Sequence, residues 1–122
     1  MIKSGSVNVY VSDMDRAIKF YTDVLGMKLI MNAGGHYAQI AAGGGLVLGL
    51  HPASPQAPKP GTRGSISIGL APDRPLDQAV AELTKRGVAF RGPVVNDPPV
   101  QLAFFGDPDG NELYLVEFKA PQ

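Results

Sequence analysis

An internal repeat constrains the fold of this 122-residue chain more than any other feature. Hydrophobic periodicity predicts a strand, a helix and three strands in the first half, and the same order returns after a proline-rich stretch. The serines that open the two halves, Ser6 and Ser65, recur at a spacing of about 60 residues, as do the helix-ending glycines Gly26 and Gly87. Two copies are too few for a solenoid or a propeller, so we expect them to pair.

We therefore predict an α+β fold in a single domain that spans residues 1–122. Its two tandem βαβββ modules cover residues 1–51 and 65–122, and the linker at residues 52–64 contains four prolines. The modules are expected to form a curved mixed sheet around a cavity, with the helices on the outer face.

Local patterns place the elements of both modules. In the first module, residues 6–12 alternate as a strand, and a helix is expected between a cap at Ser12 or Asp13 and its end at Gly26. Strands are predicted at 27–31, 36–41 and 46–51. In the second module, a strand at 65–70 precedes a helix between Pro75 and Gly87, and strands follow at 88–90, 100–105 and 112–118.

Composition excludes several classes of function. Eleven Lys and Arg residues balance eleven Asp and Glu residues, so no net charge attracts nucleic acid or an anionic membrane, and neither is an expected partner. The absence of cysteine excludes disulfides and thiolate metal sites. No apolar run approaches the roughly 20 residues of a membrane span and no signal peptide is evident, so a cytoplasmic protein is expected.

The strands predict two sheet faces of different character. One face is aliphatic, with residues such as Val9, Leu48 and Leu113, and needs helix cover. The opposite face carries small and polar residues, which line either a ligand cavity or a solvent-exposed surface. We interpret it as the cavity wall, because both halves present the same kind of face. The predicted ligand-binding residues are Ser6, Asn8, Tyr10, Tyr37, Gly49, His51, Ser65, Ser67, Glu112 and Tyr114.

Two stretches carry a family resemblance: "VYVSDMDRAIKFYTDVLGMKL" at residues 9–29 and "FFGDPDGNELYLVE" at residues 104–117. With them the chain resembles the vicinal oxygen chelate superfamily, which includes glyoxalase I, extradiol dioxygenases, fosfomycin resistance enzymes and bleomycin resistance proteins. The order of elements extends this resemblance over essentially the whole chain, and it implies the glyoxalase/bleomycin resistance fold.

The resemblance also implies where a metal ion would bind. Metal-dependent members carry His, Glu or Gln at four positions, which correspond here to Ser6, a position at or next to Gly49, Ser65 and Tyr114. Two serines, a glycine and a phenol do not supply the imidazole and carboxylate ligands that divalent ions require. We therefore predict no metal and no cofactor. A rebuilt site from His36, His51 and Glu112 remains the alternative.

Other polar residues are interpreted structurally. Asp13, Asp15 and Asp23 suit helix capping and a solvated helix face, and Asp107 and Asp109 suit the tight turn in "DPDG". Arg63 either pairs with an anionic ligand group or is an exposed surface residue.

These observations favour a metal-free protein that binds a small, planar and partly apolar molecule, such as an antibiotic. Tyrosines would stack on the ligand, and serines and Asn8 would hydrogen-bond it. No catalytic residue is assigned. One alternative is an enzyme of the same superfamily, a lyase, isomerase or dioxygenase, with a rebuilt site or with proton transfer by Tyr114, His51 or Glu112. Another is a domain kept for protein–protein contact. The resemblance implies a homodimer.

Overall fold

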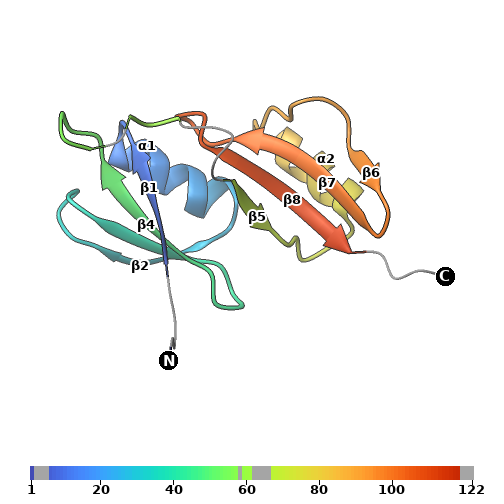
Figure 1. The fold of residues 1–122 in the computed structure, drawn as a ribbon, viewed down its shortest axis with the longest axis horizontal. Helices are drawn as coiled ribbons and strands as arrows, with labels where there is room; N and C mark the ends of the chain where they lie inside the picture. The colour runs from blue at the N-terminus through green and yellow to red at the C-terminus, as the bar shows by residue number, and fades with distance from the viewer. Residues whose placement is uncertain (2–5, 58, 62–66, 119–122) are drawn as a thin grey trace. The chain divides into compact units, whose positions relative to one another are not determined.

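The computed structural model describes residues 1, 6–57, 59–61 and 67–118. It divides into two compact units, Met1–Gly61 and Thr62–Gln122, and within the described residues each unit holds one four-stranded sheet (Figure 1). None of the helices in this described part is long and apolar enough to cross a membrane.

The first unit runs through β1 (Val7–Val11), α1 (Met14–Lys19), the π-helical turn η1 (Phe20–Val24), β2 (Lys28–Asn32), β3 (Ala38–Ala41) and β4 (Val47–Pro52). The sheet order is β1-β4-β3-β2, in which only β1 and β4 are parallel. The second unit runs through β5 (Ile68–Leu70), α2 (Leu76–Lys85), β6 (Val95–Asp97), β7 (Val100–Gly106) and β8 (Glu112–Phe118). Its order, β5-β8-β7-β6, repeats the same topology and confirms the βαβββ duplication.

Each helix covers one face of its own sheet. In the first unit α1 lies against β4, and Val11, Leu48 and Leu50 have no exposed surface. In the second unit α2 lies against β7 and β8, where Phe105 and Leu113 are fully buried. The alternation seen in the sequence therefore separates a covered face from a face that the unit's own helix leaves open.

The first helix begins as predicted and ends differently. Asp13 is its N-cap, accepting a hydrogen bond from the Arg16 backbone N–H at 3.0 Å, and Gly26 beyond its end has a φ of 78°. The last turn is π-helical, because the Leu25 N–H bonds to the Phe20 carbonyl five residues back. The sequence pattern at residues 20–24 predicted an ordinary α-helix.

One predicted strand is wrong. Residues 88–90 form only a single bridge, between Phe90 and Phe105, and the second strand of the unit is β6. The Val88 N–H instead donates a hydrogen bond to the Leu83 carbonyl, and the Gly87 N–H donates one to the Thr84 carbonyl. These two bonds form a Schellman motif, so Val88 belongs to the end of α2 rather than to a strand.

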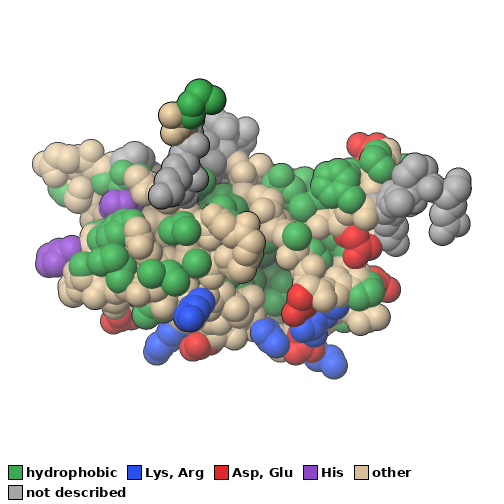
Figure 2. Space-filling model, turned by 90° about the horizontal axis from the view of Figure 1, so that it is seen from below, with side chains coloured by type: hydrophobic (Ala, Val, Ile, Leu, Met, Phe, Trp, Pro, Cys, Tyr) green, Lys and Arg blue, Asp and Glu red, His purple; other side chains and the backbone are tan. Residues whose placement is uncertain are grey.

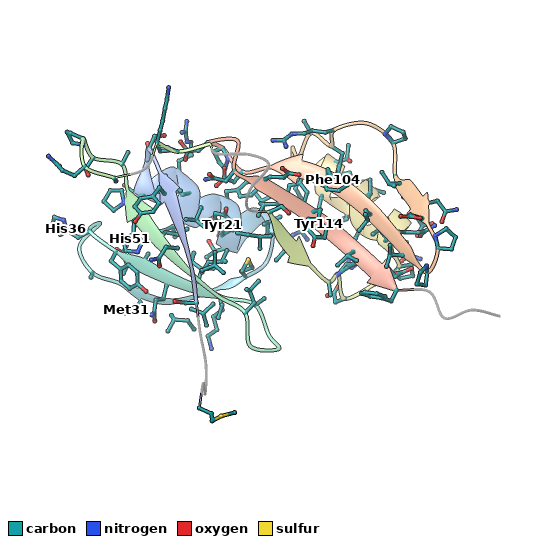
Figure 3. The ribbon with its side chains drawn as sticks, in the orientation of Figure 1. Tyr21, Met31, His36, His51, Phe104 and Tyr114 are labelled. Carbon is teal, nitrogen blue, oxygen red and sulfur yellow. The ribbon has the colours of Figure 1, made fainter. Side chains whose placement is uncertain are left out.

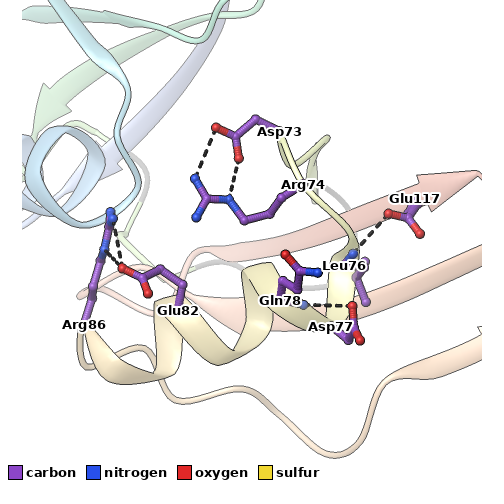
Figure 4. A network of polar contacts seen from close by, with 8 residues as sticks. All are labelled: Asp73, Arg74, Leu76, Asp77, Gln78, Glu82, Arg86 and Glu117. Atoms are coloured by element: carbon purple, nitrogen blue, oxygen red, sulfur yellow. Dashed lines mark hydrogen bonds and ion pairs between the residues drawn. The ribbon is translucent and has the colours of Figure 1, made fainter.

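The start of α2 is held from outside the helix. Pro75, at its N-cap, makes no side-chain capping bond. The carboxylate of Glu117 on β8 instead accepts a hydrogen bond from the Leu76 backbone N–H at 3.0 Å (Figure 4). A carboxylate at this position also interacts favourably with the positive end of the helix dipole.

The turn before β8 has the structural role that its sequence indicated. The Asp107 carboxylate is buried and accepts hydrogen bonds from the Asp109 N–H at 3.0 Å, the Asn111 N–H at 2.8 Å and the Asn111 side-chain amide at 2.9 Å. Gly110 in the same turn has a φ of 82°, which glycine adopts without strain.

Candidate functional site

Each sheet presents one face that its own helix does not cover. We call these faces open face A and open face B. Open face A consists of Asn8, Tyr10, Tyr37, Gln39, Gly49 and His51. Open face B consists of Gly69, Phe104, Gly106, Glu112 and Tyr114, with Arg91 lying over it. Strand register places these residues on common faces, since Asn8 pairs with Gly49, Tyr10 with His51 and Phe104 with Tyr114.

An aromatic cluster occupies open face A. The His51 ring stacks on Tyr10 with ring centroids 5.4 Å apart and an interplanar angle of 28°. On its other side the Tyr37 ring lies 4.9 Å away, tilted by 48°. All three residues are half-buried. The cluster therefore offers flat apolar surface with an imidazole at its centre.

The His51 imidazole has an unused hydrogen-bonding position. Its Nε2 atom is buried and bonds to no group in the described part of the chain. Leaving a buried polar atom unpaired costs on the order of 1–3 kcal/mol, so native proteins seldom do so without a function. Figure 3 shows His51 on β4 and His36 in the turn between β2 and β3.

Gly49 makes room for the polar part of open face A. A methyl group at this position would lie 2.7 Å from Asn8 Oδ1 and 3.0 Å from Tyr37 Cε1, closer than van der Waals contact allows. Glycine thus lets both side chains lie flat on β4. The Gln39 side-chain amide donates a hydrogen bond to the Tyr37 hydroxyl at 2.9 Å and holds that ring in place. Gln39 was not among the predicted site residues, although its two-residue spacing from Tyr37 places it on the same face.

Open face B repeats the arrangement with different chemistry. The Tyr114 ring lies directly over Gly69, where a methyl group would be 2.6 Å from its Cζ atom. Phe104 packs beside Tyr114 with ring centroids 5.5 Å apart (Figure 3). Phe105 points to the covered face and is fully buried, so the two phenylalanines divide between core and open face, as strand alternation requires.

Arg91 was missed in the sequence. Its guanidinium lies over Gly106, with Nη2 2.5 Å from the position that a methyl group would occupy there. Nothing in the local sequence distinguishes this arginine from a surface residue. The contact depends on a bond between segments, in which the Arg91 backbone N–H donates to the Phe104 carbonyl at 2.7 Å.

The structure separates the predicted residues into three groups. Asn8, Tyr10, Tyr37, Gly49 and His51 come together on open face A. Glu112 and Tyr114 share open face B. The remaining predicted residues are not placed on either open face by the structure. Ser6 and Ser67 are exposed just before β1 and β5, His36 is exposed in a turn, and Ser65 and Arg63 lie outside the described residues.

The residues at the expected metal positions do not fit a divalent ion. The space above Gly49 is filled by Asn8 and Tyr37, and the Tyr114 ring covers Gly69. In the described part of the chain, no three His, Asp or Glu side chains gather in a way that would hold a metal. Serine and tyrosine hydroxyls and a glycine supply neither the number nor the type of ligands that a divalent metal ion needs.

The charged network around α2 is structural. Arg74 and Asp73 form an exposed ion pair at 2.7 Å, and Arg86 pairs with Glu82 at 3.2 Å (Figure 4). The hydrogen bond and the charge of Arg74 lower the pKa of Asp73 below its usual 3.8. Exposed pairs of this kind contribute little to stability.

The chain was compared with protein families and with solved structures. The model of the Glyoxalase/Bleomycin resistance protein/Dioxygenase superfamily matches residues 3–115. The structure of TnmS3, an antibiotic binding protein from Streptomyces sp. CB03234, is similar at 34% identity and a TM-score of 0.80, with 98% of each chain covered. A glyoxalase/bleomycin resistance protein from the same Streptomyces is similar at 35% identity and a TM-score of 0.74, covering 94% of this chain and 100% of that one. No curated protein sequence matches the chain.

A third solved structure extends the similarity to another bacterium. A member of the same superfamily from Sphaerobacter thermophilus DSM 20745 shares 29% identity with a TM-score of 0.78, covering 96% of this chain and 98% of that one.

Proposed function

Because the chain belongs to the Glyoxalase/Bleomycin resistance protein/Dioxygenase superfamily, we propose that it binds a small, planar and partly apolar molecule, such as an antibiotic, without a metal ion. The observation that carries the proposal is the cluster of Tyr10, His51 and Tyr37 on open face A, with the buried imidazole nitrogen at its centre. The similarity to an antibiotic binding protein over nearly the whole chain supports the same interpretation.

The cluster suits a flat ligand for two physical reasons. Aromatic rings stack on planar molecules in offset arrangements, each worth about 0.5–1.5 kcal/mol beyond the buried area. A hydrogen bond from a ligand N–H or O–H to His51 Nε2 would satisfy the buried nitrogen and add direction. The amide of Asn8, which is exposed, adds a donor and an acceptor at the edge of the cluster.

The same nitrogen supports a second candidate function. An imidazole with a free position can take up or release a proton, so a metal-independent enzyme of the superfamily is the alternative. The two functions differ in the fate of the ligand, which a binding protein returns unchanged.

A thermal-shift screen of antibiotics and other planar natural products tests the proposal. A ligand at 100 times its dissociation constant stabilises the folded state by about 2.7 kcal/mol, which is easily measured. Mass spectrometry of the recovered ligand then separates binding from turnover. Conversion of the ligand on a catalytic timescale would favour the enzyme.

Protein variants tested with the ligand found in this screen locate the site. His51→Phe keeps a ring against Tyr10 and Tyr37 but removes both nitrogens, and we expect about tenfold weaker binding from the lost hydrogen bond. His36→Phe is the matched control, because His36 is exposed in a turn. Equal loss in both variants, or none in His51→Phe, would contradict a site on open face A.

We also propose that the protein is a homodimer. Three consecutive apolar residues of β2 are exposed: Leu29 at 40%, Ile30 at 53% and Met31 at 42%. Hydrophobic side chains are visible at the surface near the histidines, both of which belong to the first unit (Figure 2). An apolar edge of this kind favours association. Light scattering after size exclusion should give twice the 12.8 kDa mass of the chain.

A further inference from the structure

The guanidinium of Arg91 has an unusual position for an arginine of this protein. Its Nη2 end points at Gly106 on open face B, with Nη2 2.5 Å and Cζ 3.5 Å from the position of a glycine-replacing methyl group. The residue is half-buried. A charged group that gives up part of its hydration at such a place is stabilised by an anionic or hydrogen-bonding partner.

The described part of the chain supplies no such partner. The other described arginines each bond to a side chain: Arg16 to Ser12, Arg74 to Asp73 and Arg86 to Glu82. No described side chain forms a hydrogen bond or ion pair with the Arg91 guanidinium. The backbone N–H of Arg91 already ties its segment to Phe104, so the side chain is not required for that attachment.

Flat aromatic surface lies beside this cation. Phe104 stands two residues from Gly106 on β7, and Tyr114 pairs with Phe104 across the strands. Side chains two residues apart on a strand share a face and lie about 7 Å apart. Open face B therefore combines a planar cation with two rings that contact each other at 5.5 Å.

Glu112 is the carboxylate on the same face, and it does not neutralise Arg91. It is the register partner of Gly106, yet among the described side chains it forms no ion pair with Arg91. The Arg91 guanidinium therefore has no charge partner among the described residues of open face B.

We infer that Arg91 binds the carboxylate of an aromatic acid whose ring lies on Phe104 and Tyr114. The guanidinium fork matches two carboxylate oxygens, and rings stack with rings. This inference rests on residues of the second unit, whereas the proposed function rests on the His51 cluster of the first unit, so substitutions in the two units test them independently.

Naphthoate and its neutral isostere naphthamide are the probes, with affinities from titration calorimetry and contacts from amide chemical shifts. We expect naphthoate to bind the wild-type protein about tenfold more tightly and to shift the amides of Gly106 and Tyr114. In Arg91→Gln the preference for naphthoate should disappear, while Arg74→Gln removes the same charge from an exposed pair and should retain it.

Arg91→Lys keeps the charge without the fork and serves as a second variant, with an intermediate preference expected. Any of four results would overturn the inference: no saturable naphthoate binding at millimolar concentration, equal affinity for both probes, an unchanged preference in a folded Arg91→Gln protein, or shifts confined to the first unit. If the Arg91→Gln protein does not fold, the inference is tested by the amide chemical shifts of the wild-type protein with naphthoate and by the preference of Arg91→Lys for naphthoate over naphthamide.

Discussion

At the scale of single residues, glycines shape both open faces. Gly49, Gly69 and Gly106 each lie on the open face of a strand, and each is covered by a large side chain that would collide with any Cβ. These glycines are present because a neighbour occupies their side-chain space. Their conformation is ordinary, in contrast to turn glycines such as Gly26 and Gly110.

The clearest test of this arrangement is Gly69→Ala. The new methyl group would lie 2.6 Å from the Cζ and hydroxyl oxygen of Tyr114, so the ring must move, and we expect a loss of about 1–3 kcal/mol in the free energy of unfolding. Gly43→Ala is the control, because it has open space and no positive φ. Urea denaturation measures both.

A double mutant shows whether the collision is the cause. Truncating Tyr114 to alanine should remove most of the cost of Gly69→Ala, giving a favourable coupling energy between the two positions. Additive effects of the two substitutions would mean that the glycine is needed for another reason.

At the scale of elements, the two helices start by different means. The N-cap of α1 is local, since Asp13 bonds to the Arg16 N–H three residues later. The start of α2 depends on Glu117, which lies 41 residues away in the chain. The sequence alone predicted the Asp13 cap but not the Glu117 cap. A helix that is capped by a residue from a distant strand has no local sequence pattern that would reveal the cap.

Replacing Glu117 with alanine should therefore destabilise α2. We expect a loss of about 1 kcal/mol in the free energy of unfolding, from the lost cap and the lost interaction with the helix dipole. Glu82→Ala removes an exposed carboxylate that pairs with Arg86, and should cost less than about 0.5 kcal/mol. Equal losses in thermal or urea unfolding would argue against capping.

At the scale of the whole molecule, the duplicated modules share a topology but not their chemistry. In the register pair Asn8 and Gly49 of the first unit the glycine lies on β4, whereas in the register pair Gly69 and Tyr114 of the second unit it lies on β5. Open face A holds an imidazole and amides, whereas open face B holds a guanidinium and a carboxylate. Each module thus offers a different surface to a ligand.

Removal of metal is expected to leave this protein unchanged. After dialysis against a chelator, the melting temperature and the ligand binding should stay the same, because the residues at the expected ligand positions do not fit a divalent ion. Elemental analysis of the untreated protein should find Zn, Ni, Mn and Fe well below one ion per chain. Stoichiometric metal, or loss of binding on dialysis, would contradict the proposal.

The order of the elements, the helix-ending glycines and the two faces of each sheet follow from the sequence by itself, because hydrophobic periodicity and capping act within a few residues. Strand alternation is enough to assign Asn8 and Tyr10 to one face of their strand, and Gly49 and His51 to one face of theirs. Only the tertiary structure decided that Glu117 caps α2, that Val88 ends a helix, that Gln39 holds Tyr37 and that the Arg91 guanidinium lies over Gly106. These depend on contacts between segments distant in the chain or on side-chain geometry, for which a single sequence carries no periodic signal.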